Sequence, residues 1–193
     1  MTQRARETQR RLVVAAGELF HEQGIRASGI EAIIGRAGVT KMTLYAHFDS
    51  KDELVAAYLA ERDRRWREYL EDVLDRHGKP EERLLAVFDA YREWLVQGGL
   101  RGCDFVNFSA EFPELEHPGR AVVREHKAEV RRLLTELATE LGAEDSESLA
   151  EHLFMVLEGA YITGALESDE EALGRARLMA ESLIRRYSGS LRE

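Results

Sequence analysis

The sequence has almost no cysteine. Cys103 is the only one among 193 residues, so an intrachain disulfide is excluded. A single thiol fits a reducing compartment but does not demand one. No run of about 20 apolar residues is present, and no membrane span is expected. The opening MTQRARETQRR is polar and lacks the apolar centre of a signal peptide, so we expect a cytoplasmic protein.

Signatures of catalysis are lacking as well. We find no glycine-rich phosphate loop and no nucleophile elbow. The six histidines show no metal-ligand spacing, since His117, His126 and His152 fall on separate predicted helices. We therefore expect no catalytic residue, no metal and no cofactor, and an enzyme on a helical scaffold is the weakest of the functional classes. Cys103 itself is either a small buried residue or a redox sensor.

Charge is unevenly distributed along a chain whose net charge is -9. Residues 1–48 hold seven Lys/Arg against four Asp/Glu, a balance of +3, which leaves -12 on the remainder. A basic head on an acidic body is typical of a protein whose head meets a polyanion. The alternative is that so small an excess arose by chance.

The apolar residues recur with helical spacing nearly everywhere, and there are only three prolines. The pattern predicts an all-α protein of about nine helices without internal repeats. In the first helix one face is apolar and Gly24 forms the end. The members of that face are Leu12, Val13, Ala16, Leu19 and Phe20.

Capping signals mark the next three helices. The box SGIE at Ser28–Glu31 predicts a short helix over Gly29–Ala37, closed by Gly38. Thr40 predicts the cap of a third helix through Phe48. A second box, SKDE at Ser50–Glu53, predicts a long fourth helix to about His77.

The remainder of the chain is also predicted to be helical. The aromatic segment CDFVNFSAEF lies among the predicted helices, and a third capping box, SDEE at Ser168–Glu171, is expected to open the last one. The predicted long helices of this part cover residues 80–96, 118–141, 146–166 and 168–187.

Two short helices joined by a tight turn at Gly38 predict a helix-turn-helix, whose second helix can enter the major groove. At 100° per residue, Leu44 and Phe48 form its inward edge and Ala46 lies opposite them. Met42 and Thr43 flank Ala46, while three larger polar side chains stand on the shoulders of the helix. These are Lys41, Tyr45 and His47.

This face suits DNA. Thr43 can bond a base, and Met42 and Ala46 can touch a thymine methyl. The shoulder residues can reach phosphates, as can Lys51 at the start of the next helix and Ser28 before the second. The plainer alternatives are that Tyr45 and His47 brace the three-helix head and that Lys41 is a solvated charge.

The segment GIRASGIEAIIGRAGVTKMTLYAHFDSKDELV, Gly24 to Val55, carries a family resemblance. Over residues 6–55 the chain resembles the DNA-binding domain of TetR-type transcriptional regulators, above all at TLYAHF followed by SKDEL. Many members have Thr or Ser where Gly29 stands here, which leaves a hydroxyl only at Ser28. The resemblance implies a DNA-binding domain at 1–50 and a helical regulatory domain at 51–193.

It also implies a homodimeric repressor that leaves its double-stranded operator when the body binds a small molecule. We expect a mostly apolar ligand cavity between about Trp94 and Tyr161. Its candidate lining residues are Tyr91, Phe105, Phe108, Phe154, Glu158 and Tyr161. The aromatic residues can equally be core, and Glu158 can equally lie at the edge of a dimer seam.

The dimer seam is expected on the last two helices, where small residues permit close approach and an apolar stripe runs to the end of the chain. Its predicted members are Gly159, Ala160, Gly164, Ala176, Ala180, Leu183, Ile184 and Tyr187. If the stripe packs only within its own chain, a monomer results. A helical dimer that binds only proteins remains the alternative to a regulator, although it needs neither the basic head nor the TLYAHF face.

Overall fold

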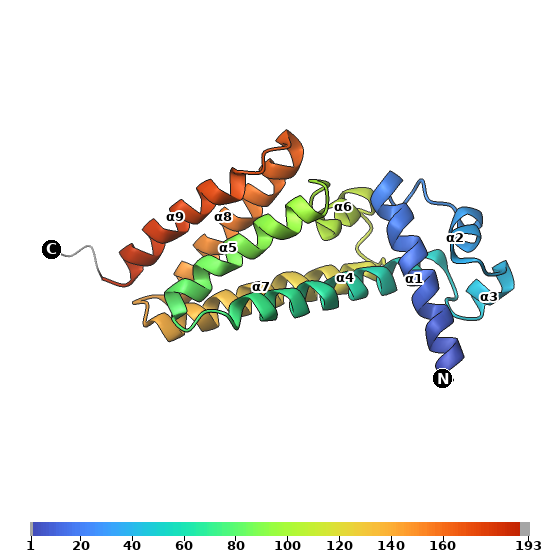
Figure 1. The fold of residues 1–193 in the computed structure, drawn as a ribbon, viewed down its shortest axis with the longest axis horizontal. Helices are drawn as coiled ribbons and strands as arrows, with labels where there is room; N and C mark the ends of the chain where they lie inside the picture. The colour runs from blue at the N-terminus through green and yellow to red at the C-terminus, as the bar shows by residue number, and fades with distance from the viewer. Residues whose placement is uncertain (1, 190–193) are drawn as a thin grey trace. The chain divides into compact units, whose positions relative to one another are not determined.

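A computed structural model describes residues 2–189. Across them the chain is all α-helical, with nine helices and no strand, as the periodicity predicts (Figure 1). The helices are α1 (Gln3–Gln23), α2 (Ile30–Ala37), α3 (Lys41–Tyr45), α4 (Lys51–Leu74), α5 (Pro80–Gln97), α6 (Asp104–Glu111), α7 (Gly119–Leu141), α8 (Ser146–Glu167) and α9 (Ala172–Tyr187).

The chain forms two compact units. Unit 1 contains residues 2–65 and 104–125, so it joins the first three helices to α6 and to the leading parts of α4 and α7. Unit 2 contains residues 66–103 and 126–189. The helices α4 and α7 each run from one unit into the other.

The short helix α6 stabilises unit 1 through hydrogen bonds to the bend between α1 and α2. The Glu111 carboxylate accepts the backbone N–H groups of Ile25, at 3.0 Å, and Arg26, at 2.7 Å. In return the Arg26 side chain donates to the Glu111 carbonyl, at 2.6 Å. Hydrogen bonds to a charged acceptor are among the stronger ones, so this contact fixes the bend that leads into α2.

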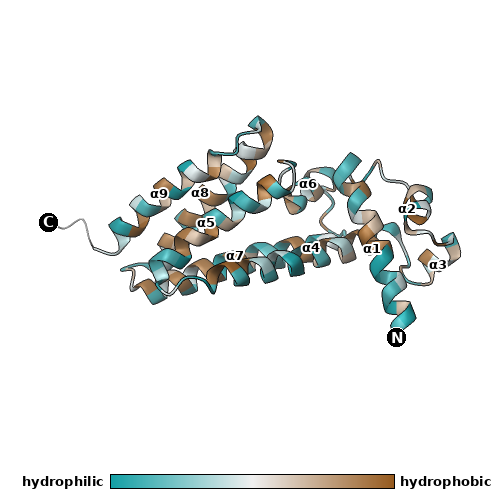
Figure 2. Cartoon of the chain, viewed as in Figure 1, coloured by the Kyte–Doolittle hydropathy of each residue, from teal (hydrophilic) through white to brown (hydrophobic). Residues whose placement is uncertain are grey.

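Unit 2 is built on α5, α8 and α9, which pack side by side (Figure 1). Their facing sides are apolar, and Phe88, Leu153 and Leu157 are fully buried between them. Figure 2 shows brown, apolar segments alternating with teal, polar ones along α5. Arg177 of α9 donates a hydrogen bond to the Asp89 carboxylate of α5 at 3.1 Å.

Two of the three predicted capping boxes are wrong. Ser28 does not cap α2, because Gly29 is the N-cap and makes no side-chain bond. Ser168 does not open α9 either; it closes α8 in a left-handed conformation, and α9 begins at Ala172. The box at Ser50 is confirmed, since its hydroxyl accepts the Glu53 N–H at 3.1 Å.

Candidate nucleic-acid interface

One glycine and one arginine fix the conformation of the turn between α2 and α3. Gly38 ends α2 in the left-handed region, at φ 64°, which a residue with a side chain adopts only with strain. Arg11 of α1 donates to the carbonyls of Ala37, at 2.5 Å, and Gly38, at 3.4 Å. The turn is therefore tied to α1 at the point where it enters α3.

The helix α3 presents the face that the sequence predicts. Leu44 and Phe48 are buried, with 0% and 4% of their surfaces exposed. Met42, at 82% exposed, and Tyr45, at 43%, point outward, and Ala46 is exposed beside them. No part of the three-helix head covers these side chains, so the face is available for contact with another molecule.

α3 is shorter than expected. It spans five residues and ends at Tyr45 rather than at Phe48, because the His47 N–H bonds to the Leu44 carbonyl and tightens the chain into a turn. Thr40 caps the start as expected, accepting the Thr43 N–H at 3.1 Å. The imidazole of His47 is consequently only half exposed.

Two lysines border this face in different environments. Lys41 lies 2.9 Å from the Glu31 carboxylate, and this hydrogen bond raises the pKa of Lys41. Lys51 is partly buried, which lowers the pKa of its ammonium group. That ammonium donates to the Ile25 carbonyl at 2.6 Å, so Lys51 helps to hold the bend between α1 and α2.

The expected phosphate contact of Ser28 is contradicted. Ser28 is fully buried, and its hydroxyl donates to the Gly24 carbonyl at 2.7 Å. The Gln23 side-chain amide donates to the Ser28 hydroxyl oxygen at 3.2 Å. Both bonds point into the three-helix head, so the side chain braces the bend and offers nothing to a ligand outside.

Sequence reasoning missed the contacts that steady the head, those of Arg11 and Glu111. Arg11 follows Arg10 in a plainly basic stretch, and nothing in the sequence marks it as a partner of the turn. Arg10 and Arg11 also line a hollow of about 210 Å³ between α1 and α2. Its other lining residues are Val14, Ala15, Glu18, Arg36 and Ala37.

The six candidate ligand residues fall in different units. Phe105 and Phe108 belong to unit 1, where Phe108 is fully buried and stacks on Phe112 with ring centroids 5.3 Å apart. Both rings are buried in unit 1, which is the core position that the sequence left open as the alternative. The others, Tyr91, Phe154, Glu158 and Tyr161, belong to unit 2.

In unit 2 the four residues meet different partners. Tyr91 and Tyr161 are both buried and touch edge to face, with ring centroids 5.4 Å apart. The Arg131 guanidinium lies 3.7 Å from the ring centroid of Phe154. Glu158 is largely buried and binds Lys127 through both carboxylate oxygens, at 2.7 and 2.6 Å, as a buried charge requires.

The predicted dimer seam is wrong in its centre. Four of its residues are buried within their own chain, because the small side chains of α9 pack onto α5 and α8. They are Gly164, Ala176, Ala180 and Ile184. A methyl group added at Gly164 would lie 2.9 Å from Leu95, which shows how closely that position faces inward.

Three of the other four predicted seam residues, Ala160, Leu183 and Tyr187, also pack against the core of unit 2. Gly159 is exposed. Around it on α8 lie apolar side chains at helical spacing that the sequence reading did not select, and two more stand on α9. These exposed residues are Met155, Ile162, Leu166, Leu178 and Met179.

Other kinds of site receive no support in the part of the chain that the structure describes. No helix there is long and apolar enough to cross a membrane. Nor does any group of three or more His, Cys, Asp or Glu side chains within residues 2–189 have the arrangement that could hold a metal ion.

The fold and the exposed α3 define a helix-turn-helix regulator of transcription, and comparison with known proteins gives its family. The chain belongs to the TetR family. Residues 12–58 match "Bacterial regulatory proteins, tetR family", and residues 80–180 match "Tetracyclin repressor-like, C-terminal domain". It is therefore a DNA-binding transcriptional regulator and not an enzyme.

Three relatives illustrate the likeness. The crystal structure of SCO4454, a TetR-family transcriptional regulator from Streptomyces coelicolor, is 32% identical with a TM-score of 0.87, over 95% of this chain and 97% of that one. The transcriptional regulator YjdC of Escherichia coli is 25% identical over 87% of this chain and 88% of its own length. The transcriptional repressor KstR2 of Mycobacterium tuberculosis is 36% identical over 41% of this chain and 40% of its own.

Proposed function

We propose that this regulator is a cytoplasmic repressor that binds a palindromic operator as a homodimer and is released by a small molecule. The observation that carries the proposal is the outward face of α3, with Met42 82% exposed above a buried Leu44. The name of KstR2 supports repression, since this relative over 41% of the chain is named a transcriptional repressor. We assign DNA binding to residues 1–50 and regulation to 51–193.

On the duplex, base contacts come from the centre of α3. Thr43 bonds a base edge, and Met42 and Ala46 pack on thymine methyl groups. Phosphate contacts come from the shoulders and fix the register of the helix in the groove. The shoulder residues are Lys41, Tyr45 and His47, and Lys51 joins them by exchanging a backbone carbonyl for a phosphate.

The effector site lies in unit 2, among Tyr91, Phe154, Glu158 and Tyr161. Two observations support this placement: the aromatic side chains cluster there, and the largely buried Lys127–Glu158 pair sets two charges in apolar surroundings. A ligand with a polar group can exchange with one member of such a pair, while its apolar part packs on the rings.

The dimer forms through the exposed apolar residues of α8 and α9. On α8, Met155, Gly159, Ile162 and Leu166 follow one another at intervals of four, three and four residues and so share a face. Leu178 and Met179 continue the apolar surface on α9. Pairing α8 and α9 with their copies about a two-fold axis gives a four-helix bundle.

The test uses duplexes selected by the protein from a random library. Wild type should recover a palindrome and bind it with a steep negative dependence on salt. Thr43→Ala should change the preferred base at one position in each half-site, by roughly 1–3 kcal/mol. If the wild-type protein selects no common sequence from the library, α3 does not read bases. The same conclusion follows if wild type and Thr43→Ala prefer the same base at every position.

A further inference from the structure

The positive charge of the DNA-binding head is concentrated in the first turns of α1. Residues 3–11 hold four arginines and one glutamate, a balance of +3. Residues 12–48 hold three cations, Arg26, Arg36 and Lys41, and three glutamates, so their balance is zero. Residues 12–48 are therefore neutral as a group, and the whole excess of residues 1–48 comes from residues 3–11.

The cations within the helix-turn-helix are already held by oxygen atoms of the protein. Arg36 binds Glu22 at 2.7 Å, which lowers the pKa of that carboxyl group. Lys41 binds Glu31, and Arg26 donates to the Glu111 carbonyl. Phosphates that approach α3 thus meet cations whose charge is shared with a neighbouring acceptor.

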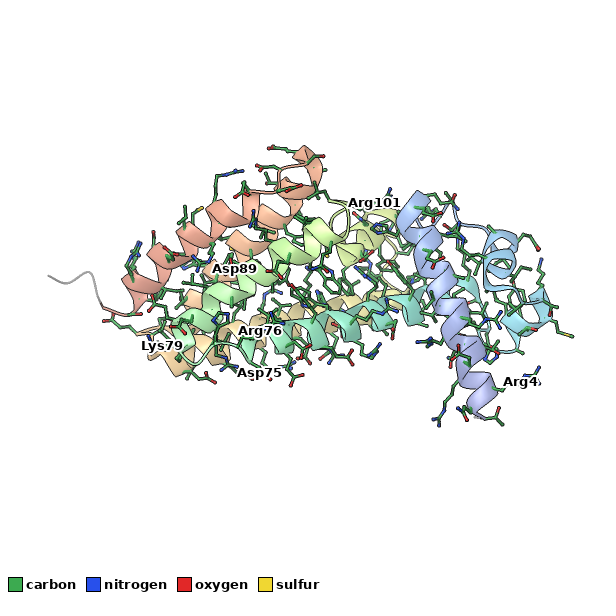
Figure 3. The ribbon with its side chains drawn as sticks, viewed as in Figure 1. Arg4, Asp75, Arg76, Lys79, Asp89 and Arg101 are labelled. Carbon is green, nitrogen blue, oxygen red and sulfur yellow. The ribbon has the colours of Figure 1, made fainter. Side chains whose placement is uncertain are left out.

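The leading turns of α1 are different. Every side chain described before Leu12 is exposed or only half-buried, and Leu12 is the first one in the core. Thr2 caps the helix, accepting the Ala5 N–H at 3.3 Å. Figure 2 shows this end of α1 as hydrophilic, and Figure 3 shows Arg4 directed away from the helix. Residues 2–10 place no fully buried side chain in the core, so this end of α1 is accessible to another molecule.

The arginines of this segment lead back to the helix-turn-helix. Arg11 bonds to the turn before α3, and Arg10 lies beside it at the hollow between α1 and α2. Arg10 pairs only loosely with Glu7, at 3.7 Å, and both are well exposed. Arg4 and Arg6 make no ion pair with any residue in the described range 2–189. Arg4 and Arg11, seven residues apart, share one face of α1, and Arg6 and Arg10, four apart, share another. Cations therefore flank α1 on two sides from the turn to its free end.

We propose that the first turns of α1, through Arg4, Arg6 and Arg10, bind phosphates of the same duplex that α3 reads. Residues 3–11 span about 13 Å at 1.5 Å per residue, a length that passes about four phosphates of one strand at 3.4 Å each. Guanidinium groups suit phosphate because they donate two parallel hydrogen bonds. This inference rests on the proposed DNA binding and adds a sequence-independent contact outside the bases.

A phosphate contact by α1 is needed because the chain as a whole is negatively charged. The chain carries -9 in all, so a duplex meets repulsion unless cations lie close to its phosphates. Screening restricts these effects to about 8 Å at physiological salt, and local charge decides the outcome. The net charge of +3 on residues 3–11 is the local excess of positive charge on the DNA-binding head.

The experiment compares Arg4→Gln/Arg6→Gln with wild type on the selected operator and on a scrambled duplex of equal length, over a range of salt. Affinity for both duplexes should fall by a similar factor of at least about tenfold near 0.1 M salt. The slope of log K against log salt should become shallower by about 0.9 for each lost phosphate contact. Two arginines in each of two protomers predict a change of about 3–4.

Two further variants separate charge from folding. Arg76→Gln/Lys79→Gln removes the same charge at exposed positions in the α4–α5 connection of unit 2 (Figure 3) and should leave the slope unchanged. Arg4→Lys/Arg6→Lys keeps the charge and should retain most of the affinity.

The outcomes that overturn the inference are distinct. If Arg4→Gln/Arg6→Gln keeps the affinity and salt slope of wild type, α1 does not bind phosphate, while operator binding by α3 stands. A loss confined to the operator, with an unchanged slope, indicates base reading instead and also overturns it. If wild type binds neither duplex, the proposed function itself fails.

Discussion

The Lys41 ammonium lies 2.9 Å from the Glu31 carboxylate and so joins the first turn of α3 to the first turn of α2. Both side chains are well exposed, at 58% and 73%, and pairs of this kind add little to stability. However, the Glu31 carboxylate already binds the Lys41 ammonium, which a phosphate of the DNA would need as its own partner. This pair therefore bears on DNA affinity more than on the fold.

Removal of the Glu31 charge should strengthen DNA binding. Glu31→Gln frees Lys41 for a phosphate and removes a negative charge that faces the duplex, so affinity should rise several-fold for operator and scrambled DNA alike. Fluorescence anisotropy at fixed salt measures it. Glu147→Gln makes the same charge change on an exposed position of α8 and should have little effect. Equal affinities of Glu31→Gln and wild type count against Lys41 as a phosphate contact.

Glu111 should be a large contributor to the stability of unit 1. Glu111→Ala leaves the Ile25 and Arg26 N–H groups without their acceptor, and we expect a loss of about 2–3 kcal/mol in the free energy of unfolding. Urea denaturation gives the value. Glu114→Ala removes only an exposed pair with Arg26, 3.4 Å apart, and should cost less than about 1 kcal/mol. If the two variants are equally stable, the bend between α1 and α2 does not depend on Glu111.

Assembly should depend on the exposed apolar side chains rather than on the buried stripe of α9. Leu178→Asp/Met179→Asp should convert a dimer into a monomer near the chain mass of 22.0 kDa, measured by light scattering at micromolar concentration. Leu115→Asp changes a residue of unit 1 that is even more exposed, and it should remain dimeric. A dimer that survives the double substitution places the seam elsewhere.

A pH dependence is expected at Glu61. Hydrogen bonds from Arg64 and then Arg65 lower the pKa of its carboxyl group from 4.5 to about 2, although burial opposes the shift. Because the folded pKa lies below the unfolded one, the stabilisation is present above about pH 4.5 and is lost as the pH falls toward 2.

Glu61→Gln should therefore lower stability near pH 7 by about 0.5 kcal/mol, as partly exposed ion pairs do. Denaturation curves of the variant and wild type should converge as the pH approaches 2. A difference that stays constant from pH 7 to pH 3 means that the charge of Glu61 is not responsible.

The faces of individual helices could be predicted from the sequence, because helical spacing alone decides which side chains share a side. The inward Leu44 and outward Met42 are the clearest case. The first residues of the helices were predicted less accurately. A serine three residues before a glutamate predicts a cap, but Ser28 is drawn into the head by the Gly24 carbonyl, and Ser168 closes the preceding helix.

Contacts between distant segments could not be predicted, since no periodicity encodes them. Small apolar residues such as Ala176 and Ala180 suit a dimer seam and an intrachain interface equally, and only the packing of α9 on α5 and α8 decides between them. The same holds for Glu158, whose partner Lys127 lies 31 residues away along the chain.

The most direct test of DNA reading by α3 is the affinity of Tyr45→Ala for the operator selected by wild type. Tyr45 is 43% exposed, so its loss should leave the melting temperature nearly unchanged. We predict that binding to the operator weakens by a large factor, while the dimer persists in light scattering. A Tyr45→Ala protein that is folded, dimeric and equal to wild type in operator affinity would contradict the assignment of α3 as the DNA-reading helix.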